Sequence, residues 1–236
     1  DKIYRDENLV ILKTTHKDNK FLNQEDRDVL EQETDSYWYD VYTLGKWGVL
    51  GNVIFENWKA EDIPSDFVRT FDNYKNGLDF GFASDPVAFN RTHYDRTRKK
   101  IYIIEELHEL GLTNPMIADE LKPIVRDEVV VCDSAEPKSI QELKDNGIKA
   151  IPAIKGPDSV NFGIQWLQQQ EIVISKKCQN TINEFQLYQW KKNKQGETLR
   201  QPTSKNDHHI DALRYSCEDE MPSLIRKKRF GTWGNR

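Results

Sequence analysis

The sequence predicts an α/β fold in which helices flank a mixed sheet made of an antiparallel meander and parallel strands. Strand-like segments follow one another closely in the first half of the domain, at residues 77–82, 87–94 and 101–107. The turn-type residues between them, such as Asp85-Pro86, are typical of an antiparallel meander. After residue 113, helical and strand-like patterns alternate, which favours parallel strands joined by crossover helices.

The later elements are expected in a regular order. Val129-Val130-Val131 is apolar throughout, as in a strand buried on both faces. The predicted helices span residues 114–126, 137–146, 159–169 and 179–188, with further strands at 149–154 and 172–175. A polar hairpin follows at about 189–205, with Gly196 in its turn, and a last helix starts near Asn206.

The front of the chain differs from the rest. Residues 1–70 are mostly polar, with a helix expected from about Asn23, a second helical stretch from Tyr37 to Gly45 and a short strand at Val53–Phe55. We expect this part to be a linker or docking segment, residues 71–220 to form the folded domain, and residues 221–236 to be a basic, flexible tail. Because the chain starts at Asp1 and no signal peptide follows, it is interpreted as a piece of a longer polypeptide.

The bulk composition excludes several classes of protein. No apolar run approaches the roughly 18 residues of a membrane span. The net charge of −5 predicts no strong attraction of the whole surface to DNA. The three cysteines are odd in number and form no C-x-x-C pair, so a reducing compartment is expected. No phosphate-binding loop of the G-x-x-x-x-G-K-[ST] type occurs, so we expect no ATPase activity in this chain.

Three acidic residues lie where the apolar pattern predicts buried elements. Asp79 is in the strand segment 77–82, where Gly77 and Gly81 are expected to leave room for a ligand or metal to approach the backbone. Asp133 follows the apolar strand at the end where open α/β sheets bind ligands. Asp211 lies in the last helix, on the face next to the apolar stripe. Taken singly, each also fits a turn, a helix cap or a solvated surface.

Together, the three aspartates predict a metal-dependent nuclease. Clustered carboxylates repel one another, so cations are needed to hold them. Oxygen ligands without thiolates select Mg²⁺ or Mn²⁺. Two such ions can bridge a phosphodiester, activate water and stabilise the leaving oxygen.

The same segments resemble a known family. The strand G-L-D-F-G-F, the later V-V-V-C-D-S and the terminal D-H-H-I-D-A-L-R-Y resemble the nuclease domain of the large terminase subunits of tailed bacteriophages, along essentially the whole chain. The segments around Thr15–Leu22 and Leu44–Gly48 resemble the part that joins the family's ATPase to its nuclease.

The resemblance implies an RNase H-like fold in which Asp79, Asp133 and Asp211 hold two divalent cations, Mg²⁺ or Mn²⁺. His208 stands where the family often has a histidine one turn before the last aspartate, so it is preferred over His209 as a ligand or proton-transfer group. Asp85 and Asp207 are expected to be accessory residues. Asp85 also fits the opening of the Asp85-Pro86 turn, and Asp207 also fits the first turn of the last helix.

The resemblance also implies a biological setting. The substrate would be concatemeric double-stranded viral DNA, cut largely without sequence preference during genome packaging in the cytoplasm of the infected bacterium. The partners would be the protein's own ATPase domain, the portal protein and the small terminase subunit, with the isolated domain a monomer. The alternatives are another RNase H-like nuclease of the resolvase or transposase type, or a non-catalytic module that docks on the portal or small subunit.

Basic residues crowd the hairpin before the last helix. They are predicted to contact DNA phosphates beside the site or to form an arm that controls access to it. A solvated hairpin with charged edges is the alternative. These residues are Lys191, Lys192, Lys194, Arg200 and Lys205.

Overall fold

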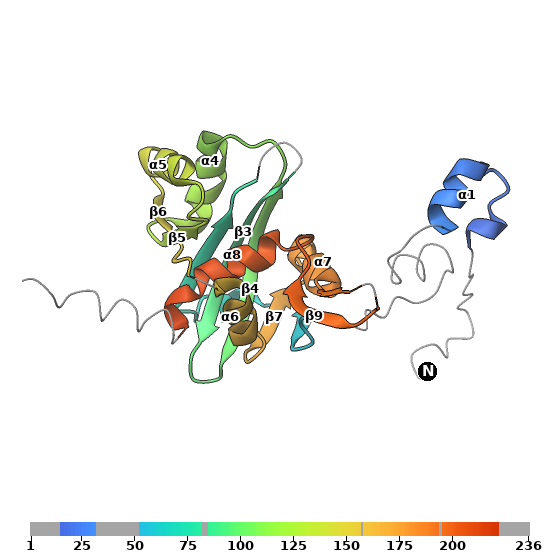
Figure 1. The fold of residues 1–236 in the computed structure, drawn as a ribbon. Helices are drawn as coiled ribbons and strands as arrows, with labels where there is room; N and C mark the ends of the chain where they lie inside the picture. Colours follow the sequence, from blue (N-terminus) through green and yellow to red (C-terminus); the bar gives the residue numbers. More distant parts are fainter. Residues whose placement is uncertain (1–14, 32–51, 82–84, 157, 194, 222–236) are drawn as a thin grey trace, which may run out of the picture. The chain divides into compact units, whose positions relative to one another are not determined.

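The computed structural model describes residues 15–31, 52–81, 85–156, 158–193 and 195–221 (Figure 1). The chain divides into two compact units, Asp1–Gly51 and Asn52–Arg236. In the first unit, Thr15 caps a short 3₁₀ helix, His16–Asp18, and α1 spans Gln24–Glu31. The Asn23 side chain accepts a hydrogen bond from the Asp26 backbone at 2.8 Å, so the helix predicted from Asn23 is confirmed. The stretch predicted from Tyr37 to Gly45 lies outside the described residues.

The second unit contains a seven-stranded mixed sheet with the order β1-β7-β4-β3-β2-β5-β6. β2, β3 and β4 form the predicted antiparallel meander, and the other neighbours pair in parallel. The predicted fold class is therefore confirmed. The strands are β1 (Trp58–Glu61), β2 (Tyr74–Asp79), β3 (Val87–Asp95), β4 (Lys100–Glu109), β5 (Val129–Cys132), β6 (Lys149–Pro152) and β7 (Glu171–Ser175).

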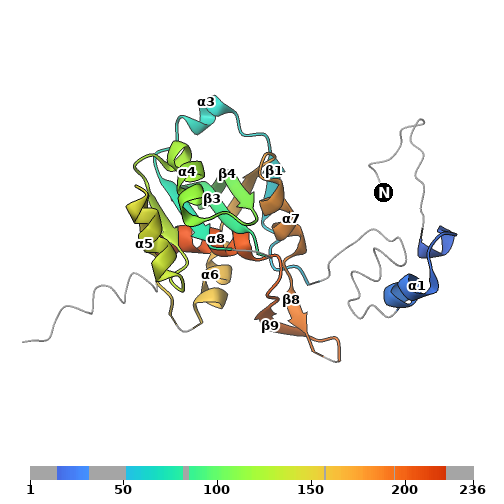
Figure 2. The ribbon, with the colours of Figure 1, turned by 90° about the horizontal axis from the view of Figure 1, so that it is seen from above.

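Helices cover both faces of this sheet (Figure 2). One face carries α4 and α5, whose apolar side chains form a cluster with Leu78, Phe89 and Val130. The other face carries α6, α7 and α8, which enclose a second cluster with Ile101, Ile103 and Ile172. The helices are α3 (Ser65–Val68), α4 (Asn114–Val125), α5 (Pro137–Asp145), α6 (Ser159–Leu167), α7 (Gln179–Leu187) and α8 (His208–Ser216), followed by a 3₁₀ helix at Glu218–Glu220.

The sheet includes a strand that the sequence pattern did not reveal. β1 pairs in parallel with β7 at the sheet edge, and only Trp58 among its four residues is partly buried. An edge strand with so little burial has no apolar alternation to mark it. Val53 forms only an isolated bridge to Gln189, instead of the predicted strand. The boundary expected near residue 70 thus falls inside the unit that carries the sheet.

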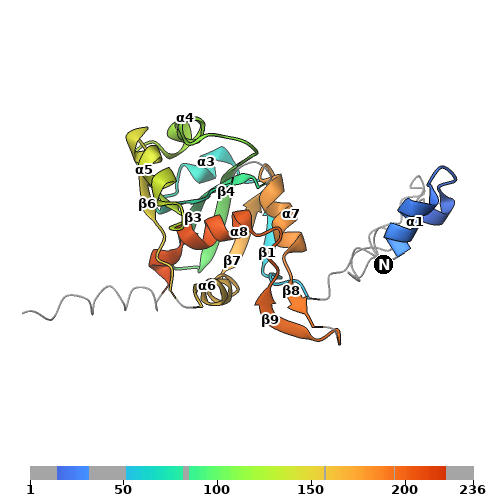
Figure 3. The same ribbon diagram turned by 45° about the horizontal axis from the view of Figure 1, so that its top comes forward.

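The predicted hairpin is present as β8 (Trp190–Lys192) and β9 (Thr198–Pro202), and Figure 3 shows it extending from the body just before α8. Gly196 lies in its turn with a φ of +84°, a conformation that glycine adopts without strain. The three cysteines are free and buried, as expected. Within the described residues, no helix is both long and apolar enough to cross a bilayer. The expected basic tail lies almost wholly outside those residues.

Candidate metal centre

Two of the three predicted aspartates lie side by side at the ends of parallel strands. Asp79 is the last residue of β2 and Asp133 directly follows β5. Leu78 is in register with Cys132, and the Asp133 backbone donates a hydrogen bond to the Leu78 carbonyl at 3.1 Å. Their side chains are 14% and 19% exposed. Both carboxylates are therefore partly buried, and they reach solvent where the carboxyl ends of β2 and β5 lie side by side.

Helix α8 brings the third aspartate to this end of the strands because the helix crosses β2 in direct contact with the β2 backbone. A Cβ atom added at Gly77 would lie 1.8 Å from the carbonyl oxygen of Ala212. We expected Gly77 and Gly81 to leave room for a ligand, and this is wrong. Gly77 makes room for α8, and an added Cβ at Gly81 would meet the Pro86 carbonyl oxygen at 2.1 Å. The close approach at Gly77 places Asp211, next to Ala212, beside Asp79.

His208 contacts Asp79 from the first turn of α8. Its Nδ1 lies 3.0 Å from Asp79 Oδ2, and this hydrogen bond raises the pKa of His208 to about 9. Burial raises the pKa of Asp79, and the negative charges of Asp211 and Asp133 act in the same direction. The Asp211 and Asp133 carboxylates are thus close enough to Asp79 for their charges to act on it.

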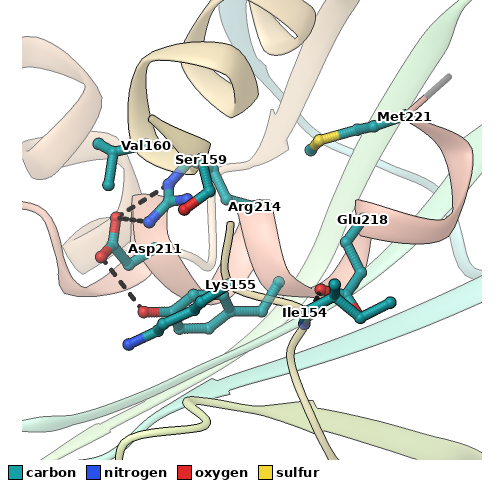
Figure 4. Close-up of a pocket in the computed structure, with 9 residues that line it drawn as sticks. Ile154, Lys155, Ser159, Val160, Asp211, Arg214, Glu218 and Met221 are labelled. Carbon is teal, nitrogen blue, oxygen red and sulfur yellow. Dashed lines mark hydrogen bonds and ion pairs between the residues drawn. The ribbon is translucent and has the colours of Figure 1, made fainter. Parts of the chain in front are cut away.

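Asp211 is held by its own helix (Figure 4). Arg214, one turn later, approaches Asp211 Oδ1 with Nη2 at 2.8 Å and Nε at 3.1 Å, and the Tyr215 hydroxyl donates to Oδ2 at 3.4 Å. The arginine side chain is only 7% exposed and lies against Gly163 of α6, where an added Cβ would be 2.8 Å from Arg214 Cδ. Arg214 therefore has little freedom to leave Asp211.

Asp133 also has a cationic partner. Its Oδ1 accepts a hydrogen bond from the Ala135 backbone at 2.8 Å and forms an ion pair with Lys155 Nζ. Each carboxylate of the site is consequently paired with a positive group of this chain. Across the described residues, no three Asp, Glu, His or Cys side chains converge closely enough to enclose a metal ion. Binding of a cation by all three aspartates would require at least one of these ion pairs to separate.

The donor set fits a hard divalent cation. Three carboxylates offer oxygen ligands, one imidazole lies beside them, and all three described cysteines are buried elsewhere. Carboxylate oxygens are the preferred ligands of Mg²⁺ and Mn²⁺. The raised pKa of Asp79 comes first from burial, with the charges of Asp211 and Asp133 acting in the same direction, and a bound cation would favour the ionised carboxylate.

A small cavity of about 130 Å³ opens beside these residues. Figure 4 shows Lys155 at the edge of the cavity, with Asp211 and Arg214 on one side. The Lys155 Nζ lies 5.7 Å from the centroid of the Tyr215 ring. The cavity is lined by Ile154, Lys155, Ser159, Val160, Asp211, Arg214, Tyr215, Glu218 and Met221. Glu218 faces it from the other side and accepts a hydrogen bond from the Ile154 backbone at 2.5 Å.

His209 points away from the aspartates. It is fully buried, with Nδ1 3.0 Å from Asn90 Oδ1 and Nε2 3.0 Å from His108 Nδ1. Burial lowers the pKa of His209 to about 4, which keeps this imidazole neutral. Of the two adjacent histidines, the structure thus brings only His208 to the carboxylates.

The start of α8 is fixed by two side chains behind the site. Glu184 Oε2 accepts hydrogen bonds from the His209 and Ile210 backbones at 2.7 and 3.2 Å. Asn90 Nδ2 donates to the His209 carbonyl at 2.7 Å. Burial raises the pKa of Glu184 to about 8. These bonds hold the turn that carries His208 and Asp211.

The accessory residues are placed differently. Asp207 precedes α8. Burial together with the charge of Asp211 raises the pKa of Asp207 to about 6, so Asp207 is close enough to the site to be affected by its charges. Asp85 lies on the exposed turn before β3.

The basic residues of the hairpin are mostly solvent-facing. Lys191 is partly buried, while Lys192, Arg200 and Lys205 are exposed. Lys194 lies outside the described residues. The hairpin leads directly into α8 (Figure 3).

Sequence reasoning missed three residues that hold the site: Lys155, Arg214 and Glu184. Arg214 had a usable signal, because an Asp and an Arg three residues apart face each other on a helix. Lys155 and Glu184 had none, because their contacts depend on how a loop and a distant helix fold back onto the sheet.

Comparisons with known proteins identify the family of the chain. Residues 79–219 match the family model of the terminase RNase H-like domain. The chain is 33% identical to the large terminase subunit of Bacillus phage SPP1, over 96% of its own length and 55% of that protein. It is 28% identical to the PBSX phage terminase large subunit of Bacillus subtilis strain 168, over 87% of its length and 49% of that protein. The chain therefore spans about half the length of these curated relatives.

The fold is similar to a solved nuclease domain. The crystal structure of the large terminase nuclease domain from bacteriophage SPP1 with bound Mn superposes with a TM-score of 0.68 and 38% sequence identity. The match covers 72% of this chain and 99% of that one.

Proposed function

Because this chain belongs to the family of RNase H-like nuclease domains of large terminase subunits, we propose that it is an endonuclease that hydrolyses DNA phosphodiesters with divalent cations. Its substrate is concatemeric double-stranded viral DNA, which it cuts largely without sequence preference during genome packaging. The grouping of Asp79, Asp133 and Asp211 from three separate elements is the observation that carries this proposal.

Asp79, Asp133 and Asp211 hold two ions, Mg²⁺ or Mn²⁺. The SPP1 nuclease domain, at 38% identity, was solved with bound Mn, which supports a divalent cation here. When bound, such ions supply positive charge to the attacking and leaving oxygens of a phosphodiester. This chemistry needs oxygen ligands with few protein donors per ion, which matches three carboxylates.

The surrounding side chains prepare the site. Arg214 and Tyr215 orient the Asp211 carboxylate, and Glu184 fixes the turn of α8 that carries it. His208 holds a proton on the imidazole that faces Asp79, since its pKa is raised to about 9. His208 is thus the proton-transfer residue, or an accessory ligand once it has lost that proton, and Asp207 and Asp85 are accessory acids.

DNA is held by phosphate contacts. Lys191, Lys192, Lys194, Arg200 and Lys205 of the hairpin give sequence-independent affinity for the backbone. The nuclease domain ends at about residue 220 and is followed by the basic tail. The segment before the sheet connects it to an ATPase domain. As an isolated domain it is a monomer without ATPase activity. In the full-length protein its partners are that ATPase domain, the portal protein and the small terminase subunit, in the cytoplasm of the infected bacterium.

The test is cleavage of supercoiled plasmid by the 236-residue chain with Mn²⁺, Mg²⁺ or EDTA. We expect nicked and linear DNA with either metal and none with EDTA. Asp79→Asn keeps the side chain's shape and removes one metal ligand, so its rate should fall by more than the roughly 10–100-fold typical of losing an outer-shell partner. Asp119→Asn is the matched control, because Asp119 is 75% exposed on α4, on the other face of the sheet.

Two results would reject the proposal. The first is no cleavage with either metal combined with no Mn²⁺ binding in isothermal titration calorimetry. The second is equal activity of Asp79→Asn and the control.

A further inference from the structure

Lys155 is a cation at the centre of the site that the proposed chemistry has not used. It lies in the connection between β6 and α6, just after Ala153, whose backbone donates to the Cys132 carbonyl at 2.8 Å. This bond continues the pairing of β5 with β6 and delivers Lys155 beside Asp133. Its Nζ is also 5.7 Å from the centroid of the Tyr215 ring. The ammonium group therefore stands between a proposed metal ligand and the small cavity.

The carboxylate oxygen that Lys155 contacts is already shared. Asp133 Oδ1 accepts the Ala135 backbone N–H and pairs with Lys155 Nζ. An ammonium group and a divalent cation compete for the same carboxylate and repel each other at short range. We therefore expect Lys155 to withdraw from Asp133 Oδ1 when that oxygen binds a metal ion.

Lys155 is able to move, unlike Arg214 at the neighbouring carboxylate. The Lys155 side chain is 43% exposed, against 7% for Arg214, and it ends a flexible four-carbon stem. The cavity of about 130 Å³ lies next to it, and the other charged groups lining the cavity are engaged: Arg214 with Asp211, and Glu218 with the Ile154 backbone. A released Lys155 thus has space, and the two carboxylates that line the cavity, Asp211 and Glu218, already have partners.

We propose that Lys155 is a phosphate-binding residue of the metal centre, held by Asp133 in the metal-free protein and released to a DNA phosphate when Asp133 binds a divalent cation. This inference rests on the proposed function. A lysine binds phosphate as a compact point charge without fixed geometry, which suits a group that changes partners. Lys155 would then contact the DNA backbone beside the Asp133 carboxylate.

Removal of the Lys155 side chain should change two measurable quantities, the Mn²⁺ affinity and the salt dependence of DNA binding. An ion pair this exposed contributes about 0.2–1 kcal/mol, so its removal should tighten Mn²⁺ binding by about 1.4- to 5-fold. Loss of one phosphate contact should reduce the slope of log K against log salt by about 0.9. The two effects have opposite signs, since the variant gains metal affinity and loses DNA affinity.

The experiment measures binding instead of cutting. Lys155→Ala, Lys155→Arg and the control Lys149→Ala are titrated with MnCl₂ by calorimetry without DNA. A fluorescent 20-base-pair duplex is then bound at several salt concentrations with Ca²⁺ as the divalent ion. Lys149 suits the control because it lies on β6, is 58% exposed and forms a comparable ion pair with Asp127 at 3.5 Å.

For Lys155→Ala we expect tighter Mn²⁺ binding and a shallower salt slope, while Lys155→Arg keeps the wild-type slope and Lys149→Ala resembles wild type. An unchanged slope in Lys155→Ala overturns the phosphate contact. Unchanged Mn²⁺ affinity overturns the release from Asp133. Plasmid cleavage by the wild type is scored separately, so a failure of the nuclease function is not confused with either result.

Discussion

Helices α4 and α8 lie on opposite faces of the same sheet and are held there in different ways. α4 buries Ile117, Ala118, Leu121 and Val125, a purely apolar stripe. α8 buries Ile210 and Leu213, but its first turn also donates a backbone hydrogen bond to Glu184 and accepts one from Asn90. The apolar attachment of α4 is non-directional, whereas hydrogen bonds depend steeply on distance and angle.

The difference shows where positional accuracy is needed. α4 carries none of the proposed catalytic groups, and besides its buried apolar stripe it accepts a hydrogen bond from Arg91 Nη1 at the Ile124 carbonyl, at 2.6 Å, close to its C-terminal end. α8 carries His208 and Asp211, and a metal centre tolerates errors of only about 0.5 Å in its ligands. Buried polar bonds cost desolvation energy, and they are found here behind the turn that needs to be fixed. The comparison can be tested by disturbing each helix separately.

The largest effect is expected from Gly77→Ala, which separates α8 from β2. The added methyl group would lie 1.8 Å from the Ala212 carbonyl oxygen, a backbone atom that cannot move without shifting the helix. We expect a loss of on the order of 4 kcal/mol in unfolding free energy or failure to fold. Urea denaturation measures this, with Gly111→Ala as the control. Gly111 has a φ of +72° and no atom near its added Cβ, so it should cost only about 1 kcal/mol. Equal losses in both variants would mean that α8 does not depend on this contact.

Leu121→Ala should disturb α4 alone. Leu121 is fully buried in the apolar cluster, so the cavity should cost about 2–5 kcal/mol. Because α4 lies on the face away from the site, Mn²⁺ affinity of the protein that remains folded should not change. Denaturation and calorimetry on the same sample give both values. A weakened Mn²⁺ site would show that the two faces are mechanically coupled.

The sequence predicted the apolar part of this architecture better than the polar part. Periodic apolar residues located α4 and β5, and Asp79 and Asp133 were recognisable because they interrupt or end such runs. β1 was missed, because an edge strand with one partly buried residue has no pattern. Gly77 was assigned to ligand access, since a sequence does not show which backbone crosses which.

Contacts between distant segments were the other feature that could not be predicted from the sequence. Glu184 and Lys155 belong to a helix and a loop that reach the site only through tertiary folding. A buried carboxylate such as Glu184 looks like an ordinary polar position of an amphipathic helix. His208 was preferred to His209 on the resemblance alone, and the structure brings only His208 to the carboxylates.

Asn90→Ala should loosen α8 with a smaller loss of stability. Asn90 donates to the His209 carbonyl and accepts from Thr181, and both partners would remain buried without it. We expect a loss of about 1–3 kcal/mol, less than for Leu121→Ala, together with weaker Mn²⁺ binding because the first turn of α8 is less well fixed. If stability falls while Mn²⁺ affinity stays unchanged, the polar bonds serve only folding, and the contrast between the two helices is wrong.

Glu184→Gln tests whether the stability contributed by the attachment of α8 depends on pH. The buried stripe of α4 contains no titratable side chain. Burial raises the pKa of Glu184 from 4.5 to about 8 in the folded protein, so folding favours the protonated acid. The stabilisation is complete below pH 4.5 and is lost as the pH rises toward 8, at up to about 1.4 kcal/mol per pH unit. Glutamine still offers one oxygen to both backbone N–H groups and does not titrate.

The stability of Glu184→Gln relative to wild type should therefore increase from pH 5 to pH 8 in urea denaturation. His208 and Asp207 also titrate near Glu184, but they are present in both proteins, so the difference between the two curves isolates the Glu184 proton. Leu121→Ala is the matched control and should differ from wild type by the same amount at every pH. A constant difference for Glu184→Gln would mean that the two backbone hydrogen bonds keep Glu184 ionised, which would make α8 a helix held by a buried charge.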